Sequence, residues 1–302
     1  MEANNNFKSG FVALIGRPNV GKSTLLNALA GEKVAIVSSK PQTTRSRQNA
    51  VVTTDEYQIA FVDTPGIHKP KSKLSEYMDR TVDRNVSDVD VVVLLVEPRS
   101  PSQKDMLAIE KIKNVKCPVL LAINKIDTLK KHRLLELISE YTKFHDFDDV
   151  VSISAYTGEN LNILTDCILK YLPFGPKYYD DDYLTDQTER RLIEEVIREK
   201  TLHLMEDEIP HGVAVLVEKM EKREGRNLLD ISAVIFCEKD SHKGMIIGKK
   251  GAMLKKIGQN ARGELELILN IKINLQLWAK IKKDWRNSGT QVKSMGYDIK
   301  KT

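Results

Sequence analysis

A glycine-rich stretch near the start of the chain has the residue types that bind phosphate groups. Gly16 is followed by four variable residues and then by Gly21, Lys22 and Ser23, which is the spacing of a phosphate-binding loop. Glycines allow successive backbone N–H groups to face one anion at the start of a helix. Lys22 is predicted to reach the β- and γ-phosphates, and Ser23 to bind Mg²⁺. The predicted nucleotide contacts here are Gly16, Arg17, Pro18, Asn19, Val20, Gly21, Lys22, Ser23 and Thr24.

A second motif is suited to the metal ion that accompanies a nucleotide. Asp63, Thr64, Pro65 and Gly66 directly follow an apolar run at 57–62. An aspartate at the carboxyl end of a buried strand lies where ligands bind in open α/β sheets. We therefore expect Asp63 to hold Mg²⁺ through water, and Gly66 to let the backbone approach a γ-phosphate.

A third motif, Asn124-Lys125-Ile126-Asp127, has the chemistry needed to read a guanine base. Guanine presents N1–H and N2–H₂ side by side, so the carboxylate of Asp127 can accept both, whereas adenine presents an acceptor and is rejected. Asn124 is expected to tie this loop to the phosphate loop, and Lys125 to lie along the base. A backbone N–H of Ser154, Ala155 or Tyr156 is expected to meet guanine O6.

The elements that must position these motifs alternate between strands and helices. The apolar segment 11–15 reads as a buried strand, and 24–30 as a helix that ends at Gly31. Because further strand-like runs are separated by helical or polar connections, we predict an α/β fold with a doubly wound, mainly parallel sheet. These runs are 50–53, 57–62, 90–96, 118–123 and 150–153.

Composition describes an ordinary water-soluble globular protein of two domains. The 302 residues are 41% hydrophobic and 29% charged, with a net charge of +5. The asparagine-rich start predicts no signal peptide, and no run approaches the ~20 apolar residues of a membrane span. Three scattered cysteines and six histidines predict a reducing compartment and no structural zinc.

The charge is unevenly distributed along the chain. Residues 241–302 contain 14 Lys and Arg against 4 Asp and Glu, a local charge of +10, so the preceding 240 residues sum to −5. A basic block of this kind favours a polyanionic partner for the C-terminal end, and the alternative interpretation is a lysine-rich solvated surface.

Residues 10–170 together resemble the translation-factor-like GTPases. The resemblance implies GTP and GDP as ligands, Mg²⁺ as cofactor, and Thr43 or Thr44 as the switch threonine. We favour Thr44 as the Mg²⁺ ligand and expect Lys22, Thr44 and Gly66 to serve catalysis. Ile67 stands where Ras-like proteins have the glutamine that orients the attacking water, so intrinsic hydrolysis is expected to be slow.

The second half of the chain resembles a type II KH domain, an α+β fold. Asp186 is expected to cap a helix, with Glu189 as its capping-box partner. Strands at 213–219 and 228–237 follow, and then a helix, a Gly-x-x-Gly loop, a second helix at 252–269 and a strand at 270–281. Trp278 and Trp285 could stack on bases but are more often packing residues. The expected RNA contacts are Lys243, Gly248, Lys249, Lys250, Gly251, Lys255 and Lys256.

A GTPase domain followed by a type II KH domain is the architecture of the Era family, which the chain resembles over nearly its whole length, including Lys40-Pro41-Gln42-Thr43-Thr44-Arg45. We expect the GTPase domain at 1–175, a linker at 176–187, the KH domain at 188–287 and a tail at 288–302. The tail carries no reliable signal.

The resemblance also implies a function and a location. It implies binding to the 3′ end of 16S ribosomal RNA and a role in maturation of the 30S subunit, with the GTPase domain as a switch that controls the KH domain. A cytoplasmic monomer, in part peripheral at the membrane, is expected. Some Era-related GTPases use an asparagine at the position of Asn19 to coordinate K⁺, so K⁺ is a further candidate cofactor, unless Asn19 only braces the loop.

Two other functions remain open on the sequence alone. A metabolic P-loop kinase would use the same phosphate loop, but the guanine-reading motif argues against it. A protein- or membrane-docking module would have a KH fold that binds no RNA.

Overall fold

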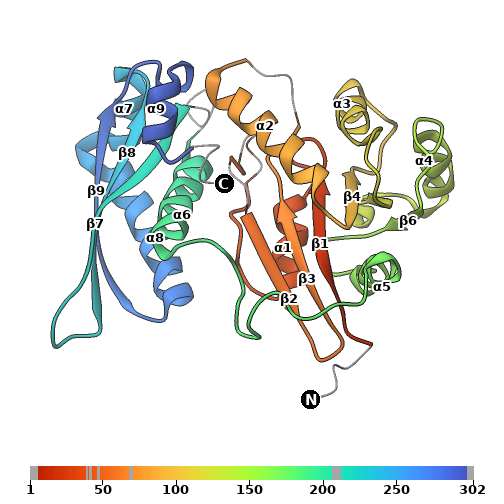
Figure 1. The fold of residues 1–302 in the computed structure, drawn as a ribbon. Helices are drawn as coiled ribbons and strands as arrows, with labels where there is room; N and C mark the ends of the chain where they lie inside the picture. The colour runs from red at the N-terminus through yellow and green to blue at the C-terminus, as the bar shows by residue number, and fades with distance from the viewer. Residues whose placement is uncertain are drawn as a thin grey trace.

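The computed structural model describes most of the chain. Described are residues 6–38, 40, 43–45, 48–67, 71–205 and 212–297. Pro41 and Gln42, which belong to the Era-like segment, lie outside the described residues. Figure 1 shows two units side by side, each built on its own sheet.

The N-terminal unit contains a six-stranded sheet with the strand order β2-β3-β1-β4-β5-β6. Neighbouring strands are parallel except β2 and β3, which form an antiparallel pair. β4 and β5 are buried along their whole length, as strands covered on both faces are. The predicted doubly wound, mainly parallel sheet is therefore confirmed. Its strands are β1 (Lys8–Ile15), β2 (Gln48–Thr53), β3 (Tyr57–Asp63), β4 (Val91–Val96), β5 (Val119–Ile123) and β6 (Asp149–Ser152).

Helices cover both faces of this sheet. α1 and α5 place Leu25 and Ile168 in one apolar cluster, which lies on one face. α2, α3 and α4 place Val82, Ile109 and Tyr141 in a second cluster on the other face. The five helices are α1 (Lys22–Ala30), α2 (Lys73–Ser87), α3 (Gln103–Ile112), α4 (Leu134–Tyr141) and α5 (Leu161–Tyr171).

The C-terminal unit contains a three-stranded sheet in the order β7-β8-β9. β7 and β8 are antiparallel, and β8 and β9 are parallel. Side chains of α6, α7 and α8 join the sheet in one core, among them Ile197, Ile246 and Ile257. The predicted order of helices and strands is confirmed. The elements are α6 (Glu189–Leu204), β7 (Ala214–Lys222), β8 (Leu228–Cys237), α7 (Asp240–Ile247), α8 (Ala252–Leu269) and β9 (Lys272–Ile281).

Two local predictions in this unit are wrong. α6 is capped by Thr188, whose side chain accepts from the N–H of Arg191, and not by Asp186. The carboxylate of Asp186 instead accepts the backbone N–H of Asn49, at 3.0 Å. β7 continues to Lys222 rather than ending at 219, because charged residues expected in the following turn still pair with β8, Glu221 with Asp230 and Lys222 with Leu229.

The connection between the units lies along the edge strand β2. The N–H of Val51 donates to the carbonyl of Leu184 at 2.9 Å, and Ala50 and Thr185 form an isolated bridge. The segment predicted as a linker thereby covers backbone groups that an exposed edge strand would leave open.

The residues after β9 return to the N-terminal unit. A short 3₁₀ turn, η5 (Trp285–Asn287), and α9 (Gly289–Ser294) precede Tyr297. Val292, Met295 and Tyr297 form one buried cluster with Tyr77 and Met78 of α2. The sequence predicts no element in this region. Among the helices that the structure describes, none combines the length and the apolar composition that crossing a membrane requires.

Candidate functional site

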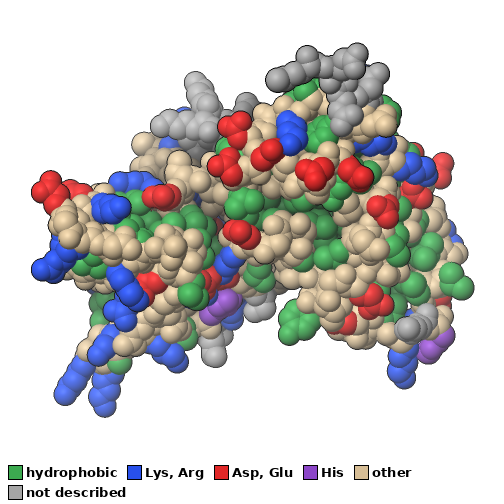
Figure 2. All heavy atoms as spheres, turned by 90° about the horizontal axis from the view of Figure 1, so that it is seen from below, with side chains coloured by type: hydrophobic (Ala, Val, Ile, Leu, Met, Phe, Trp, Pro, Cys, Tyr) green, Lys and Arg blue, Asp and Glu red, His purple; other side chains and the backbone are tan. Residues whose placement is uncertain are grey.

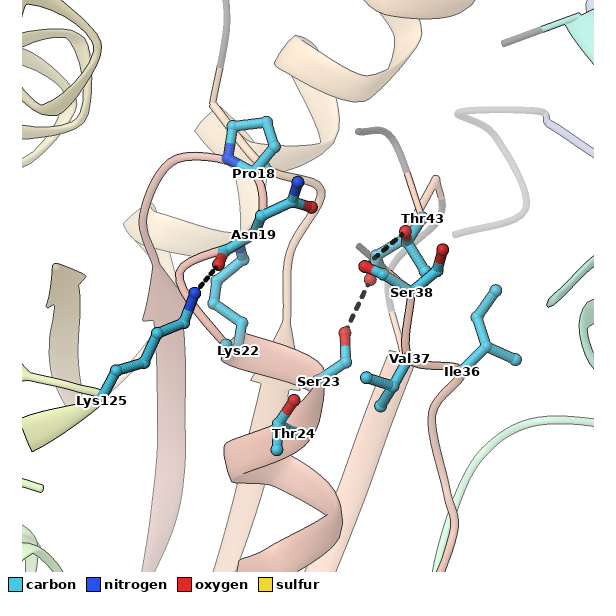
Figure 3. A pocket seen from close by; sticks show the side chains of 13 residues that line it. Pro18, Asn19, Lys22, Ser23, Thr24, Ile36, Val37, Ser38, Thr43 and Lys125 are labelled. Atoms are coloured by element: carbon cyan, nitrogen blue, oxygen red, sulfur yellow. Dashed lines mark hydrogen bonds between the residues drawn. The ribbon is translucent and has the colours of Figure 1, made fainter. Parts of the chain in front are cut away.

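The phosphate loop forms one wall of a cavity of about 410 Å³. The loop connects β1 to α1, and the cavity is lined by its residues together with 36–38, Thr43, Thr44, Gly66 and Lys125 (Figure 3). Gly21 has a φ of 101°, and a Cβ there would lie 2.3 Å from Nδ2 of Asn124. Only glycine therefore fits at this point of the loop.

Lys22 is buried at the base of the cavity. Its Nζ donates to the carbonyl oxygens of Gly16 and Arg17, at 3.0 and 3.3 Å. Burial lowers the pKa of Lys22 to about 8, with Asp63 opposing this shift and Arg17 adding to it. A nucleotide's phosphates would supply the negative charge that this ammonium needs.

The three predicted Mg²⁺ ligands lie together. The Ser23 hydroxyl donates to Oδ2 of Asp63 at 2.9 Å and lies 3.0 Å from the Thr44 hydroxyl, which is itself 3.2 Å from Asp63 Oδ2. The hydroxyl of Thr43 instead donates to the carbonyl of Lys40, at 2.6 Å. Thr44 and not Thr43 is thus the threonine beside Asp63.

Asp63 itself suits a hard cation. It is fully buried, and among the described residues its Oδ1 has no hydrogen-bond partner. Burial raises the pKa of Asp63, although Lys22 and the hydroxyls of Ser23 and Thr44 act in the opposite direction. A carboxylate and two hydroxyls form an oxygen-only donor set, which Mg²⁺ prefers when substrate phosphates complete its shell.

The segment after Asp63 contributes backbone rather than side chains. Thr64 donates its hydroxyl to the carbonyl of Leu14 at 2.8 Å, and Pro65 is buried beside it. A Cβ on Gly66 would lie 2.7 Å from backbone atoms of Pro18, so the loop passes close to the phosphate loop. The side chain of Ile67 is buried in the apolar cluster of α2 and α3 and is therefore unavailable to orient water.

The base-reading loop is connected to the phosphate loop as predicted. Asn124 donates from Nδ2 to the carbonyl of Val20 at 2.8 Å, and its Oδ1 accepts the N–H of Ala155 at 2.9 Å. Nζ of Lys125 points to the carbonyl of Asn19, 2.8 Å away (Figure 3).

The remaining base-site residues lie at the end of β6. The carboxylate of Asp127 accepts from the hydroxyl of Ser154 at 2.6 Å, which orients it, and Tyr156 is exposed. The N–H of Ala155, one of the groups expected at guanine O6, donates instead to Asn124.

Sequence reasoning missed Glu97 and Asp105. Glu97 accepts from both Arg17 and Lys125, and Arg17 also donates to Asp105 from Nε at 3.2 Å. Burial alone would raise the pKa of Glu97, but hydrogen bonding to Lys125 and the charge of Arg17 lower it. A signal existed for Glu97, because it directly follows the carboxyl end of β4.

The Gly-x-x-Gly loop joins α7 to α8 in the C-terminal unit. Gly248 has a φ of 71°, and a Cβ there would lie 2.6 Å from that of Met253. Lys249 and Lys250 are exposed on the turn, and Lys250 has the positive φ of 51°. Lys255 and Lys256 are exposed on the first turns of α8, and Lys243 is half-buried on α7. Figure 2 shows basic side chains gathered on this unit, at the left.

A groove of about 400 Å³ lies beside this loop, between α8 and β9. Leu254, Leu275 and Leu277 form its apolar floor, and Lys255 and Arg262 line it. Arg262 was missed because it lies eleven residues beyond the loop, on a helix turn with no motif of its own. Apolar surface beside exposed cations suits a single-stranded nucleic acid.

The two tryptophans have different environments. Trp285 is fully buried and donates from Nε1 to the carbonyl of Gly212 at 2.9 Å, so it is a packing residue. Trp278 is 44% exposed and lies opposite Val234 of β8 in the sheet register.

Comparisons with known proteins find relatives of both units. Residues 11–125 match the family described as 50S ribosome-binding GTPase, and residues 208–286 match the KH domain family. GTPase Era of Thermoanaerobacter sp. (strain X514) is 52% identical over 97% of this chain and 98% of its own. GTPase Era of Clostridioides difficile (strain 630) is 51% identical over 97% and 100%.

Two solved structures are similar over nearly the whole chain. One is Era in complex with MgGDPNP and nucleotides 1506–1542 of 16S ribosomal RNA, with a TM-score of 0.94, 40% identity and coverage of 97% and 100%. The other is a single-residue variant of Aquifex aeolicus Era bound to GDP·AlF₄⁻, with a TM-score of 0.92 and the same identity and coverage. With relatives at about half identity over almost all of both chains, the chain belongs to the Era family of GTPases.

Proposed function

We propose that this GTPase binds the single-stranded 3′ end of small-subunit ribosomal RNA through its Gly-x-x-Gly loop and assists assembly of the 30S subunit. The observation that carries the proposal is the exposed pair Lys249 and Lys250 on a glycine turn beside the groove of α8 and β9. KH loops of this form press their backbone against phosphates. The relative whose structure contains 16S ribosomal RNA nucleotides supports the choice of RNA.

The nucleotide is proposed to act as a switch for this RNA binding. The cavity of the phosphate loop would take GTP or GDP, with Asp127 reading guanine and Lys22 contacting phosphates. Ser23, Thr44 and Asp63 would hold Mg²⁺, which neutralises charge on the β- and γ-phosphates when bound. Thr44 lies on a segment without helix or strand, so its position can depend on the γ-phosphate.

K⁺ is a second proposed ion. Asn19 lines the nucleotide cavity and stands at the loop position from which an asparagine side chain can reach an ion against the phosphates. Such an ion would bring positive charge to a site where Ile67 supplies no polar group.

The experiment that tests the proposal measures RNA affinity in each nucleotide state. A fluorescent RNA with the 3′-terminal sequence of 16S ribosomal RNA and a scrambled RNA of equal length are titrated in the presence of Mg²⁺ with GDPNP or GDP. Tighter binding of the authentic sequence, with an affinity that changes between the two nucleotides, supports the proposal. Equal affinity for both RNAs in both states would contradict it.

The proposal extends to the location and the assembly state. The family resemblance leads us to propose a cytoplasmic monomer, part of which associates peripherally with the membrane. Cell fractionation, light scattering and co-sedimentation with anionic vesicles check these three points separately.

A further inference from the structure

The segment that contains Thr44 is held by the C-terminal unit on both sides of that residue. Arg198 of α6 donates from Nη2 to the backbone carbonyl of Thr43. Arg45 donates from Nη1 to the carbonyl of Val213, the residue directly before β7, at 2.6 Å. The residues that flank Thr44 are therefore attached to the C-terminal unit, while the Thr44 hydroxyl faces Ser23 and Asp63.

Both of these arginines are buried. Arg45 and Arg198 are each 1% exposed. Arg198 is paired with Glu195, one helical turn earlier, at 3.1 Å from Nε to Oε1. The guanidinium of Arg45 lies 5.8 Å from the ring centre of Trp285. Because a buried charge without partners is costly, these contacts define one arrangement of the segment rather than many.

The last described residue, Tyr297, completes this cluster. Its ring lies 6.1 Å from that of Trp285 and 5.9 Å from that of Tyr77 on α2. The guanidinium of Arg191 lies 5.0 Å from the ring centre of Tyr297. Burial acts to lower the pKa of the Arg45 and Arg191 guanidiniums, and the nearby Tyr297 side chain acts in the opposite direction. One tyrosine thus contacts the Thr44 segment, α6 and α2.

The placement of α2 extends the same contact to the other side of the cavity. α2 begins at Lys73, seven residues after Gly66. On its first turns, Leu74, Tyr77 and Met78 pack against α9. Figure 1 shows α9 and α2 at the same end of the molecule, where the two units meet. Two loops are expected at the γ-phosphate, one with Thr44 and one with Gly66. The C-terminal segment therefore contacts the residues that flank Thr44 and the helix α2 that follows Gly66.

We propose that Arg198 and Tyr297, both outside the GTPase domain, are positioning residues for GTP hydrolysis that hold Thr44 at the Mg²⁺ site. The proposal rests on the proposed role of Thr44 as a Mg²⁺ ligand. Ordering a segment without helix or strand costs conformational entropy, and contacts with the C-terminal unit reduce that cost. By thermodynamic linkage, a nucleotide that fixes Thr44 also stabilises the docked C-terminal segment.

The test compares Arg198→Gln and Tyr297→Phe with two matched controls. Arg226→Gln removes an exposed arginine in the same unit, and Tyr178→Phe removes the hydroxyl of an exposed tyrosine. Single-turnover GTP hydrolysis is measured at a series of Mg²⁺ concentrations, together with GDP affinity and the thermal midpoint. Tyr297→Phe keeps the ring, so it remains informative if Arg198→Gln does not fold.

We expect a pattern that a purely structural role would not produce. Arg198→Gln should lower the hydrolysis rate by roughly 10- to 100-fold and raise the Mg²⁺ concentration needed, and Tyr297→Phe should act in the same direction by roughly threefold or more. GDP affinity should change by less than about twofold, because GDP has no γ-phosphate that could contact the Thr44 segment. Arg198→Lys should recover part of the rate. Unchanged rates and Mg²⁺ dependence in Tyr297→Phe would overturn the proposal.

Double variants separate this inference from the function on which it rests. If Thr44→Ala lowers the rate and adding Tyr297→Phe or Arg198→Gln lowers it little further, the two act through Thr44. If the rate reductions of the single variants multiply fully in the double variants, the positioning role is wrong while the role of Thr44 stands. If Thr44→Ala alone leaves hydrolysis and its Mg²⁺ dependence unchanged, the proposed role of Thr44 is wrong, and this inference falls with it.

Discussion

The side-chain amide of Asn124 donates to the backbone carbonyl of Val20 at 2.8 Å, which joins the base-reading loop to the phosphate loop. The two loops are more than a hundred residues apart in the sequence, and each follows the carboxyl end of a parallel strand. Base recognition and phosphate binding in this GTPase therefore share one rigid frame.

Asp127→Asn should change the base specificity from guanine to xanthine. In the wild type, the Ser154 hydroxyl donates to the Asp127 carboxylate at 2.6 Å. An amide at position 127 can still accept from Ser154 and can donate to the extra carbonyl of xanthine. We expect the preference for GTP over XTP to fall by roughly 100-fold or more. Competition of GTP and XTP against a fluorescent nucleotide measures it, with the exposed Asp146→Asn as control. A mutant that still prefers GTP would show that Asp127 does not read the base.

Glu97→Gln should weaken GTP and GDP binding to a similar extent. The substitution leaves Arg17 and Lys125 with a neutral partner, so both loops lose a charge-assisted hydrogen bond of about 1.5–3 kcal/mol. We expect dissociation constants to rise by roughly 10- to 150-fold and the hydrolysis rate of bound GTP to stay the same. Isothermal titration and single-turnover assays check the two expectations, with the exposed Glu110→Gln as control. A lower hydrolysis rate at saturating GTP would place Glu97 in the chemical step instead.

Hydrolysis should be slow and several-fold faster in KCl than in NaCl of equal ionic strength. The reason is the buried Ile67, together with Asn19 at the cavity. Asn19→Gly removes the side chain and tolerates the φ of 67° at this position, so it should abolish the difference between the salts without unfolding the loop. Equal wild-type rates in the two salts would exclude a role for K⁺.

Trp285→Ala should destabilise the protein far more than Trp278→Ala. Removing a fully buried tryptophan that donates to Gly212 costs about 3–5 kcal/mol, whereas Trp278 is partly exposed. Thermal unfolding of both variants measures the difference. If Trp285→Ala instead left stability unchanged and weakened only RNA binding, its assignment as a packing residue would be wrong.

Much of the nucleotide site could be predicted because its residues occupy motifs at strand ends. The phosphate loop, Asp63 and Asn124 each follow an apolar run whose type and order specify a doubly wound sheet. Glu97 also follows such a run, but a single glutamate before Pro98 has no spacing that marks it. Its partners become evident only when the sheet brings Arg17 and Lys125 to the same edge.

Contacts between distant segments could not be predicted in this way. Arg198 and Thr43 are 155 residues apart, and both arginines of the buried cluster have the sequence context of ordinary surface residues. α9 has only six residues, so its apolar side chains form no convincing period without the surface of α2. The cap of α6 was misplaced because Asp186 and Thr188 are both good capping residues and Asn49 occupies the first of them.

The most direct test of RNA recognition by the Gly-x-x-Gly loop is the salt-dependent RNA affinity of a double variant, Lys249→Asp with Lys250→Asp. Lys219→Asp with Lys222→Asp makes the same change in charge on exposed positions of β7 and is the matched control. If the loop binds RNA, the first variant loses single-stranded RNA binding, shows a shallower salt dependence in any residual binding, and keeps wild-type GTP affinity, while the control retains RNA binding. RNA recognition by this loop would be contradicted if the Lys249 and Lys250 variant bound the 3′-terminal 16S sequence with wild-type affinity from low to high salt.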